Sequence, residues 1–206
     1  GEFYFEDVEM TGAGLAVNKT LFLASSVLGD VTKVSVADSW FHDNDSDLIS
    51  TSGNFSNPVE NGSSLVLYDV LAHGSGPNPQ DQVLTAHNGF PLIAVGGFFW
   101  GSSVNVVAPD SAFTRTDLYF AEVIGRIRIP STISQIAYCQ IVTPFMTLWG
   151  TLRDSVVVWS APSWAMIDDQ PSSQVLRNTL QNPSGFPGRP LGGLGLAIDN
   201  VFEGWN

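Results

Sequence analysis

The residues that could carry chemistry are concentrated in one acidic stretch. Asp43, Asp45 and Asp47 alternate along the chain, and a calcium-binding loop begins with such alternate carboxylates. That loop also needs glycine at its sixth position and glutamate at its twelfth, where this chain has Leu48 and Asn54. The motif is therefore incomplete. A solvated acidic loop and a non-standard calcium site both stay open, and we expect no bound metal.

Other catalytic signatures are incomplete as well. The glycine-rich run at 192–195 follows a proline-rich loop and precedes a strand, whereas a dinucleotide-binding loop follows a strand and opens a helix. Glycoside hydrolysis needs two carboxylates facing each other across a cleft, and the adjacent Asp168 and Asp169 would point to opposite sides of an extended chain. None of the three histidines has metal-site spacing; they are His42, His73 and His87. The sequence predicts a protein that is not an enzyme and has no cofactor.

Aromatic residues give the positive signal, and it is a signal for binding. Trp149 and Trp159 end strand-like runs, which favours the core. Trp40 stands just before the acidic stretch and Trp164 lies in a proline-rich loop, so these two are candidates for stacking on a sugar or packing against a partner. The predicted receptor-binding loop consists of Trp40, His42, Asp43, Asp45 and Asp47.

A second candidate surface rests on two arginines. Arg126 and Arg128 share one face of a predicted strand. Arginine is enriched at protein interfaces, although a solvated sheet edge would explain the pair equally well. The predicted partner contacts are Arg126, Arg128 and Trp164.

Composition limits the classes of function. The 206 residues carry 20 acids and 8 bases, for a net charge of −12. This balance argues against a nucleic-acid partner and against docking on an anionic membrane, since both need clustered Lys and Arg. Apolar residues make up 44%, which predicts a globular chain, taken here as one domain over 1–206. The single cysteine, Cys139, excludes an internal disulfide, and we expect it to be buried.

Short runs rich in β-branched and aromatic residues, bounded by Gly, Pro, Asn or Asp, predict an all-β fold. No fixed-period repeat is evident. We expect an antiparallel β-sandwich or β-barrel with long loops over 40–61 and 162–193, and at most one or two short helices, the best at 172–181. The segment 130–132 would be the turn between two alternating strands. The predicted strands cover residues 3–10, 20–28, 33–37, 65–71, 82–87, 92–100, 103–107, 118–129, 133–142, 145–149, 153–160 and 194–202.

The N-terminal third resembles the opening of a viral capsid protrusion domain. The stretches that carry this resemblance are Phe5-Glu-Asp-Val-Glu-Met-Thr-Gly-Ala-Gly, Leu21-Phe-Leu-Ala and Ser35-Val-Ala-Asp-Ser-Trp-Phe. Length, acidity and the lack of cysteine pairs resemble the capsid spike of avian astroviruses, with a weaker similarity to the protruding domain of hepatitis E virus. Beyond Phe41 the resemblance is one of length and composition alone.

That resemblance implies a β-barrel or β-sandwich spike that forms a homodimer on the virion surface. Such a spike would attach the virion to a host-cell receptor, protein or glycan, and carry epitopes for neutralising antibodies. It would be a fragment of a longer capsid polyprotein made in the host cytoplasm, with no enzymatic activity, nucleic-acid contact or membrane insertion. Two alternatives stay open: a carbohydrate-binding β-sandwich module of bacterial or phage origin, and a glycosidase-like β-sandwich enzyme.

Overall fold

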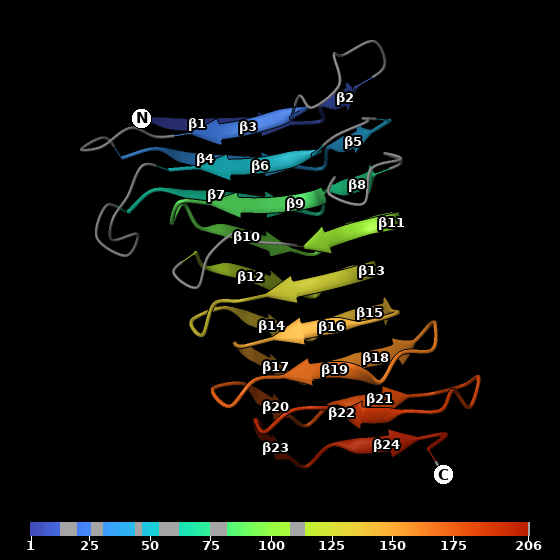
Figure 1. Ribbon diagram of the computed structural model, residues 1–206. Helices are drawn as coiled ribbons and strands as arrows, with labels where there is room; N and C mark the ends of the chain where they lie inside the picture. The colour runs from blue at the N-terminus through green and yellow to red at the C-terminus, as the bar shows by residue number, and fades with distance from the viewer. Residues whose placement is uncertain are drawn as a thin grey trace.

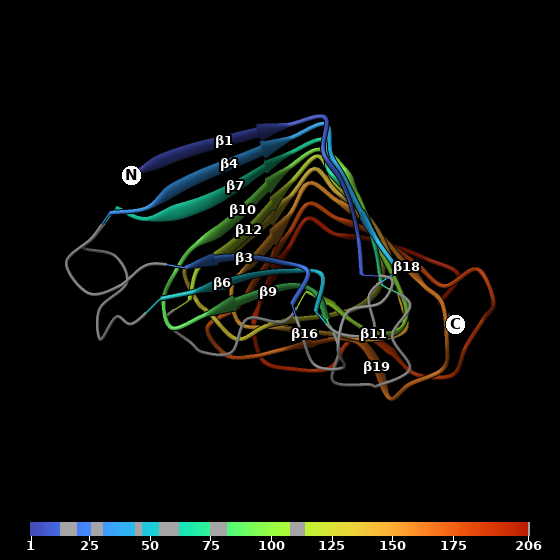
Figure 2. The ribbon, with the colours of Figure 1, turned by 90° about the horizontal axis from the view of Figure 1, so that it is seen from above.

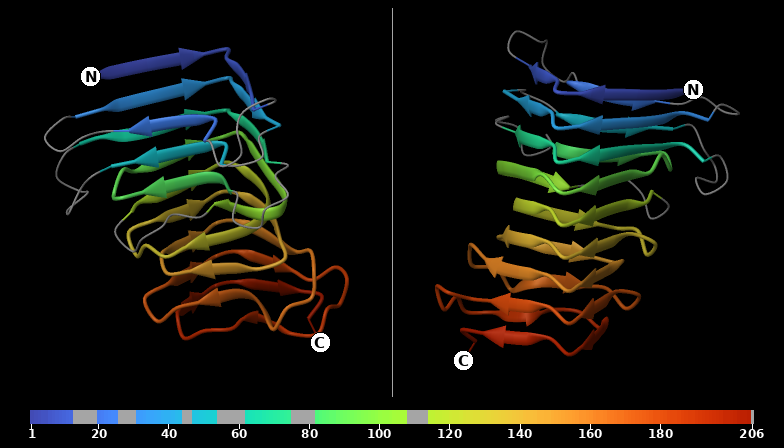
Figure 3. Two further views of the ribbon diagram at one scale, coloured as in Figure 1. Left: turned by 45° about the horizontal axis from the view of Figure 1, so that its top comes forward. Right: turned by 180° about the vertical axis from the view of Figure 1, so that it is seen from behind.

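The chain winds into a three-sided column of stacked coils, a parallel β-helix (Figure 1). The computed structural model describes residues 1–12, 20–25, 31–43, 47–53, 62–74, 82–107 and 114–205, with the backbone alone over 102–105. Seen along the column, the cross-section is triangular (Figure 2). The coils follow one another in sequence order from the N-terminal to the C-terminal end (Figure 3).

The first face of the column is a sheet of nine strands, one from each successive coil. These strands are β1 (Glu2–Glu6), β4 (Lys33–Ala37), β7 (Ser64–Tyr68), β10 (Leu92–Val95), β12 (Thr116–Tyr119), β14 (Gln135–Ala137), β17 (Thr151–Arg153), β20 (Gln174–Leu176) and β23 (Leu196–Ile198).

The second and third faces form one sheet of fifteen strands, because β11 (Phe98–Val107) and β13 (Glu122–Ile129) run across both. The second face also contains β2 (Glu9–Thr11), β5 (Trp40–His42), β8 (Leu71–Gly74), β15 (Gln140–Thr143), β18 (Val156–Trp159), β21 (Thr179–Gln181) and β24 (Val201–Glu203). The third face also contains β3 (Phe22–Ser25), β6 (Ile49–Ser52), β9 (Gln82–His87), β16 (Met146–Leu148), β19 (Ala165–Asp169) and β22 (Arg189–Leu191).

The prediction of an antiparallel sandwich or barrel is wrong, because the pairings between the described strands are parallel. β13 and β14, expected to flank a hairpin turn, pair with other coils and not with each other. The segment expected to be a helix, 172–181, contains β20 and β21. The all-β expectation is confirmed: none of the described residues is helical, and no helix among them could span a membrane.

Parallel register places like residues above one another in the core. One inward column on the first face consists of Phe5, Val36, Leu67, Ala94, Leu118, Ile136, Leu152, Val175 and Ala197. Every member between the two terminal coils is buried. Side chains alternate along a strand, so the residues on either side of this column point outward. Each coil therefore covers its neighbours, and the core is a continuous stack.

The corner between the first and second faces has a left-handed residue in every coil. Their φ angles lie between 47° and 59°, with 72° at the one glycine. Outside glycine, aspartate and asparagine adopt this conformation most readily, and aspartate fills five of the nine positions. The corner residues are Asp7, Asp38, Asp69, Gly96, Phe120, Tyr138, Asp154, Arg177 and Asp199.

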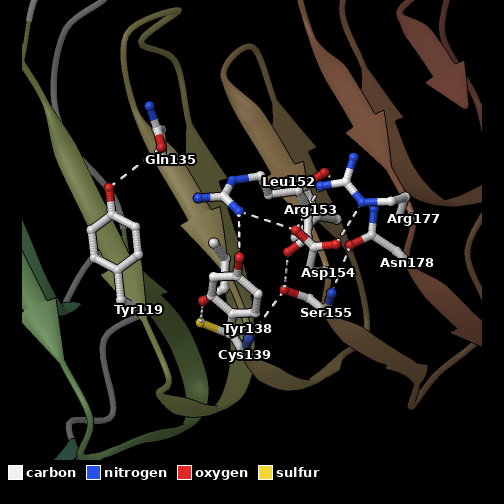
Figure 4. A network of polar contacts seen from close by, with 11 residues as sticks. Tyr119, Gln135, Tyr138, Cys139, Leu152, Arg153, Asp154, Ser155, Arg177 and Asn178 are labelled. Carbon is white, nitrogen blue, oxygen red and sulfur yellow. Dashed lines mark hydrogen bonds and ion pairs between the residues drawn. The ribbon is translucent and has the colours of Figure 1, made fainter.

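The residue after each corner residue turns inward, and in the C-terminal coils these residues form a polar ladder (Figure 4). Asn200 Oδ1 accepts the Asn178 backbone N–H at 2.9 Å, Asn178 Oδ1 accepts that of Ser155 at 3.0 Å, and Ser155 Oγ accepts that of Cys139 at 3.1 Å. Cys139 is buried, as expected. Burial raises the pKa of its thiol to about 11, so Cys139 stays protonated and serves the packing.

Outside the same corner, side chains of four coils contact one another. Figure 4 shows those of Tyr138, Arg153, Asp154 and Arg177. Asp154 accepts hydrogen bonds from Arg177 Nε and Nη2 at 2.7 and 2.8 Å and from Arg153 Nη1 at 3.0 Å. Arg153 Nη1 also donates to the Tyr138 hydroxyl at 2.9 Å. The Tyr138 ring stacks on that of Phe120, with centroids 5.0 Å apart. The pKa of Asp154 is lowered, chiefly by its hydrogen bonds from Arg177 and to a smaller extent by that from Arg153.

Substitution inside the core column should cost far more than substitution beside it. We expect Leu152→Ala to lower the free energy of unfolding by about 2–5 kcal/mol, because the coils on either side cannot close the cavity. Gln174→Ala, on the next strand but with an exposed side chain, should change it by no more than about 0.5 kcal/mol. Urea denaturation followed by circular dichroism measures both, and equal losses would contradict the inward placement of Leu152.

The Asp154 corner should make stability depend on acid pH. The folded-state pKa lies below the ordinary 3.8, so the contribution of this carboxylate is complete above 3.8 and is lost as pH falls through the folded value. We expect Asp154→Asn to destabilise the protein at neutral pH, by an amount that shrinks as the solution becomes more acidic than the folded pKa.

Urea denaturation at a series of pH values measures this difference. Asp38→Asn is the matched control, because Asp38 occupies the same corner position and forms no ion pair with the described residues. A difference between wild type and Asp154→Asn that stays constant from neutral to strongly acid pH would contradict the assignment.

Candidate binding face

The residues predicted as one binding loop are distributed differently in the structure. Trp40 and His42 lie on strand β5 of the second face, on either side of the buried Phe41, so both point outward. Asp43 follows the strand directly. Asp47 supports the third face, where its Oδ1 accepts the Gln82 backbone N–H at 2.9 Å. Asp45 lies outside the described residues.

Two stacked ring pairs stand side by side on the second face. The rings of Trp40 and His42 have centroids 3.9 Å apart and an interplanar angle of 23°. Those of His73 and Trp100 are 4.0 Å apart at 6°. His42 and His73 are partners in the β5–β8 register, and His73 and Trp100 in the β8–β11 register. The four rings therefore span three neighbouring strands.

Aliphatic and aromatic neighbours extend these rings into a larger apolar surface. Leu71 lies between Trp40 and Phe98 in register, and Ile124 lies next to Trp100. Trp40 is 45% exposed and Trp100 37%. We call this surface the aromatic platform; it consists of Trp40, His42, Leu71, His73, Phe98, Trp100 and Ile124.

Carboxylates frame the platform. Glu9 is the register partner of Trp40 on one side, and Glu122 is that of Phe98 on the other. Both glutamates are exposed. No lysine or arginine lies on the strand segments that form the second face within the described part of the chain. The platform is thus an apolar surface with acidic ends.

His42 is held by two of the surrounding carboxylates. Its Nδ1 lies 2.7 Å from Asp43 Oδ2, and its Nε2 lies 3.1 Å from Glu9 Oε1. Both nitrogens can donate only when the imidazole is protonated. The pKa of His42 is raised, chiefly by the hydrogen bond to Asp43. Burial opposes this shift, and the hydrogen bond to Glu9 adds to it. The two carboxylates thereby hold in place the ring on which Trp40 stacks.

The predicted partner contacts lie elsewhere. Arg126 and Arg128 are exposed on the third-face part of β13, where Arg128 neighbours Thr147 in register. Trp164 is 56% exposed and lies in the corner between β18 and β19. The structure does not bring these three residues onto the face that carries Trp40.

Other predicted features can also be placed. Trp159 is buried in the core, as expected, and Trp149 is half-buried. Within the described ranges no three His, Cys, Asp or Glu side chains gather closely enough to hold a metal ion; the calcium alternative involves Asp45 and is not covered by that finding. Sequence reasoning missed five platform residues: Leu71, His73, Phe98, Trp100 and Ile124.

Comparison with known proteins gives no family to this chain. No protein-family model, no curated protein and no solved structure matches it. The face has to be interpreted from its own geometry.

The pKa of His42 should depend on its two carboxylate partners, Asp43 and Glu9. The folded-state pKa lies above the ordinary 6.5, so the stabilising contribution is complete below 6.5 and is lost as pH rises through the folded value. We expect the NMR signal of the His42 ring proton to titrate above pH 6.5. Replacing both acids, Glu9→Gln with Asp43→Asn, should bring the midpoint down. Asparagine tolerates the positive φ of Asp43, so a midpoint unmoved in this double variant would contradict the assignment.

Proposed function

We propose that the protein is a non-enzymatic recognition module that binds a glycan on its aromatic platform. The observation that carries the proposal is the pair of exposed tryptophans, each stacked on a histidine, on one flat strand face. Sugars combine an apolar C–H face with a rim of hydroxyls. Indole rings suit the first, and the surrounding carboxylates accept hydrogen bonds from the second.

The size of the platform favours a glycan over a protein partner. A stable protein interface buries about 800 Å² per partner and uses roughly 20–30 residues. The platform has seven residues and ends at Glu9 and Glu122. Charged residues are depleted at the core of protein interfaces, so extension past these two acids would be costly. A short run of sugar rings fits within the acids and uses them.

The platform is also prepared for binding before any ligand arrives. Its side chains come from strands that are paired on both sides, and each indole already rests against an imidazole. Little side-chain freedom is left to lose on binding, which raises affinity for a given contact area. Sites built on strands hold their geometry more closely than sites on loops.

Attachment to a glycan-bearing surface is the biological setting that we propose. The β-barrel or β-sandwich implied by the resemblance to avian astrovirus spikes is not the fold of this chain, so the proposal now rests on the platform. Virion attachment to a host glycan and a bacterial or phage carbohydrate-binding module would use the same face. Homodimer formation and recognition by neutralising antibodies stay predictions.

Removing either indole should weaken binding. A tryptophan side chain offers on the order of 200 Å², and a ligand that covers most of the exposed part of Trp40 would remove about 60 Å² from water. At about 25 cal/mol per Å² this is about 1.5 kcal/mol, or roughly tenfold in Kd. We expect a glycan array to give a discrete hit, and Trp40→Ala and Trp100→Ala each to weaken it by about that factor in calorimetry.

The matched control is Tyr68→Ala, since Tyr68 is 44% exposed on the first face and its removal should leave binding unchanged. Equal weakening by all three variants would indicate lost folding instead of a lost contact. An array without hits, together with capture of a protein partner through Trp40 and Trp100, would overturn the glycan proposal. Cleavage of an arrayed glycan would overturn its non-enzymatic part.

A further inference from the structure

We infer that the ligand is an uncharged, extended glycan that runs along the column, with successive sugar rings on successive coils; this inference rests on the proposed function. The direction of the glycan chain and its lack of charge each follow from a separate set of residues.

Strand spacing sets the direction. Neighbouring strands of a sheet lie about 4.8 Å apart, and one pyranose ring advances an extended β-1,4-linked chain by a closely similar length. Trp40, Leu71 and Phe98 occupy one register position on β5, β8 and β11. A glycan laid across these strands places each successive ring over an apolar side chain, because the rings and the strands repeat at nearly the same spacing.

The positions of the two indoles support the same direction. Trp40 lies on β5 and Trp100 on β11, with β8 between them. A chain lying parallel to the strands would pass along one strand and meet one indole. A chain lying along the column crosses all three strands, and it contacts both indoles when it covers two neighbouring outward rows, that of Trp40 and that of Trp100, which are two residues apart along the strands.

Charge sets the class of sugar. The platform ends at Glu9 and Glu122, and Asp43 lies beside His42. The described lysines and arginines lie away from these strands. Lys33 and Arg153 are on the first face, Arg115 directly precedes its strand β12, and Arg126, Arg128 and Arg189 are on the third face. Arg177 is a corner residue of the C-terminal coils and is hydrogen-bonded to Asp154. Like charges brought together disfavour binding. A uronate, a sialylated chain or a sulfated chain would meet carboxylates where it needs cations, since both ring nitrogens of the one titratable base beside these acids, His42, are already engaged by Asp43 and Glu9.

Oligosaccharides of increasing length test the direction. The probes are cello-, N-acetylchito- and manno-oligosaccharides of two to six rings, titrated by calorimetry. At least one series should gain affinity with each ring until it spans three coils, and then level off. Trp40→Ala and Trp100→Ala should each cost the longer members about tenfold. Affinity independent of length, or sensitivity to one indole alone, would overturn the direction.

Anionic chains of matched length test the charge. Oligogalacturonate and hyaluronan hexasaccharides should bind at least tenfold more weakly than the best neutral hexasaccharide at low salt. Glu122→Gln should raise the affinity of the anionic probes by a factor of about three, because only these are repelled by the carboxylate. The neutral probes lose a hydrogen-bond acceptor in the same variant and should gain no affinity. Equal or tighter binding of the anionic probes by the wild-type protein would overturn the inference.

The two proposals fail in different ways. An array hit on an acidic or branched glycan that depends on Trp40 and Trp100 would uphold the proposed function and remove this inference. An array and a titration series without any hit would remove both.

Discussion

The structure depends on one constraint, which is that every coil must repeat the register of the coil before it. Parallel pairing places each side chain beside its counterpart one strand away, at a distance that leaves no room for an unmatched residue. The column from Val36 to Val175 satisfies this with apolar residues throughout. A single slip by one residue would turn that whole column outward. The corner residues prevent the slip, because a left-handed residue ends the strand at the same register position in each coil.

The platform is a consequence of the same constraint on the outer surface. The same offset between the second and third coils places Leu67 next to Val36 inside the column and His73 next to His42 on its outer surface. Aromatic rings on neighbouring strands then meet face to face, as His73 and Trp100 do. A sandwich or barrel could place two tryptophans near each other, but it would not repeat their surroundings at strand spacing. The glycan that we propose as the ligand is itself a repeating chain, and this repetition is the feature of the face that it would match.

Much of the local structure could be predicted from the sequence, and the topology could not. The strands over 33–37 and 82–87 were predicted with the bounds that β4 and β9 have. Alternation in 118–129 indicated a strand with one buried side, which is correct from Ala121 onward. Such alternation is typical of an antiparallel sheet, because parallel sheets are usually buried on both sides. A β-helix is parallel yet exposes one side of every strand, so its residue pattern is that of an antiparallel sheet.

The repeat was missed because its length changes along the chain. Stacked residues are 31 positions apart from Phe5 to Val36 and again from Val36 to Leu67, but 16 apart from Ile136 to Leu152. Only the first three coils carry a visible sign, the aspartates at 7, 38 and 69. The same step of 31 joins His42 to His73. Trp40 could be identified as a binding candidate from the sequence because it stands next to the acidic stretch. Trp100 could not be identified in this way. Its stacking partner His73 lies 27 positions earlier in the sequence, and the two can be recognised as neighbours only when the length of the coil is known. A binding site that arises from stacking is therefore hidden until the register is found, whereas the core, which needs only alternation, is visible from the start.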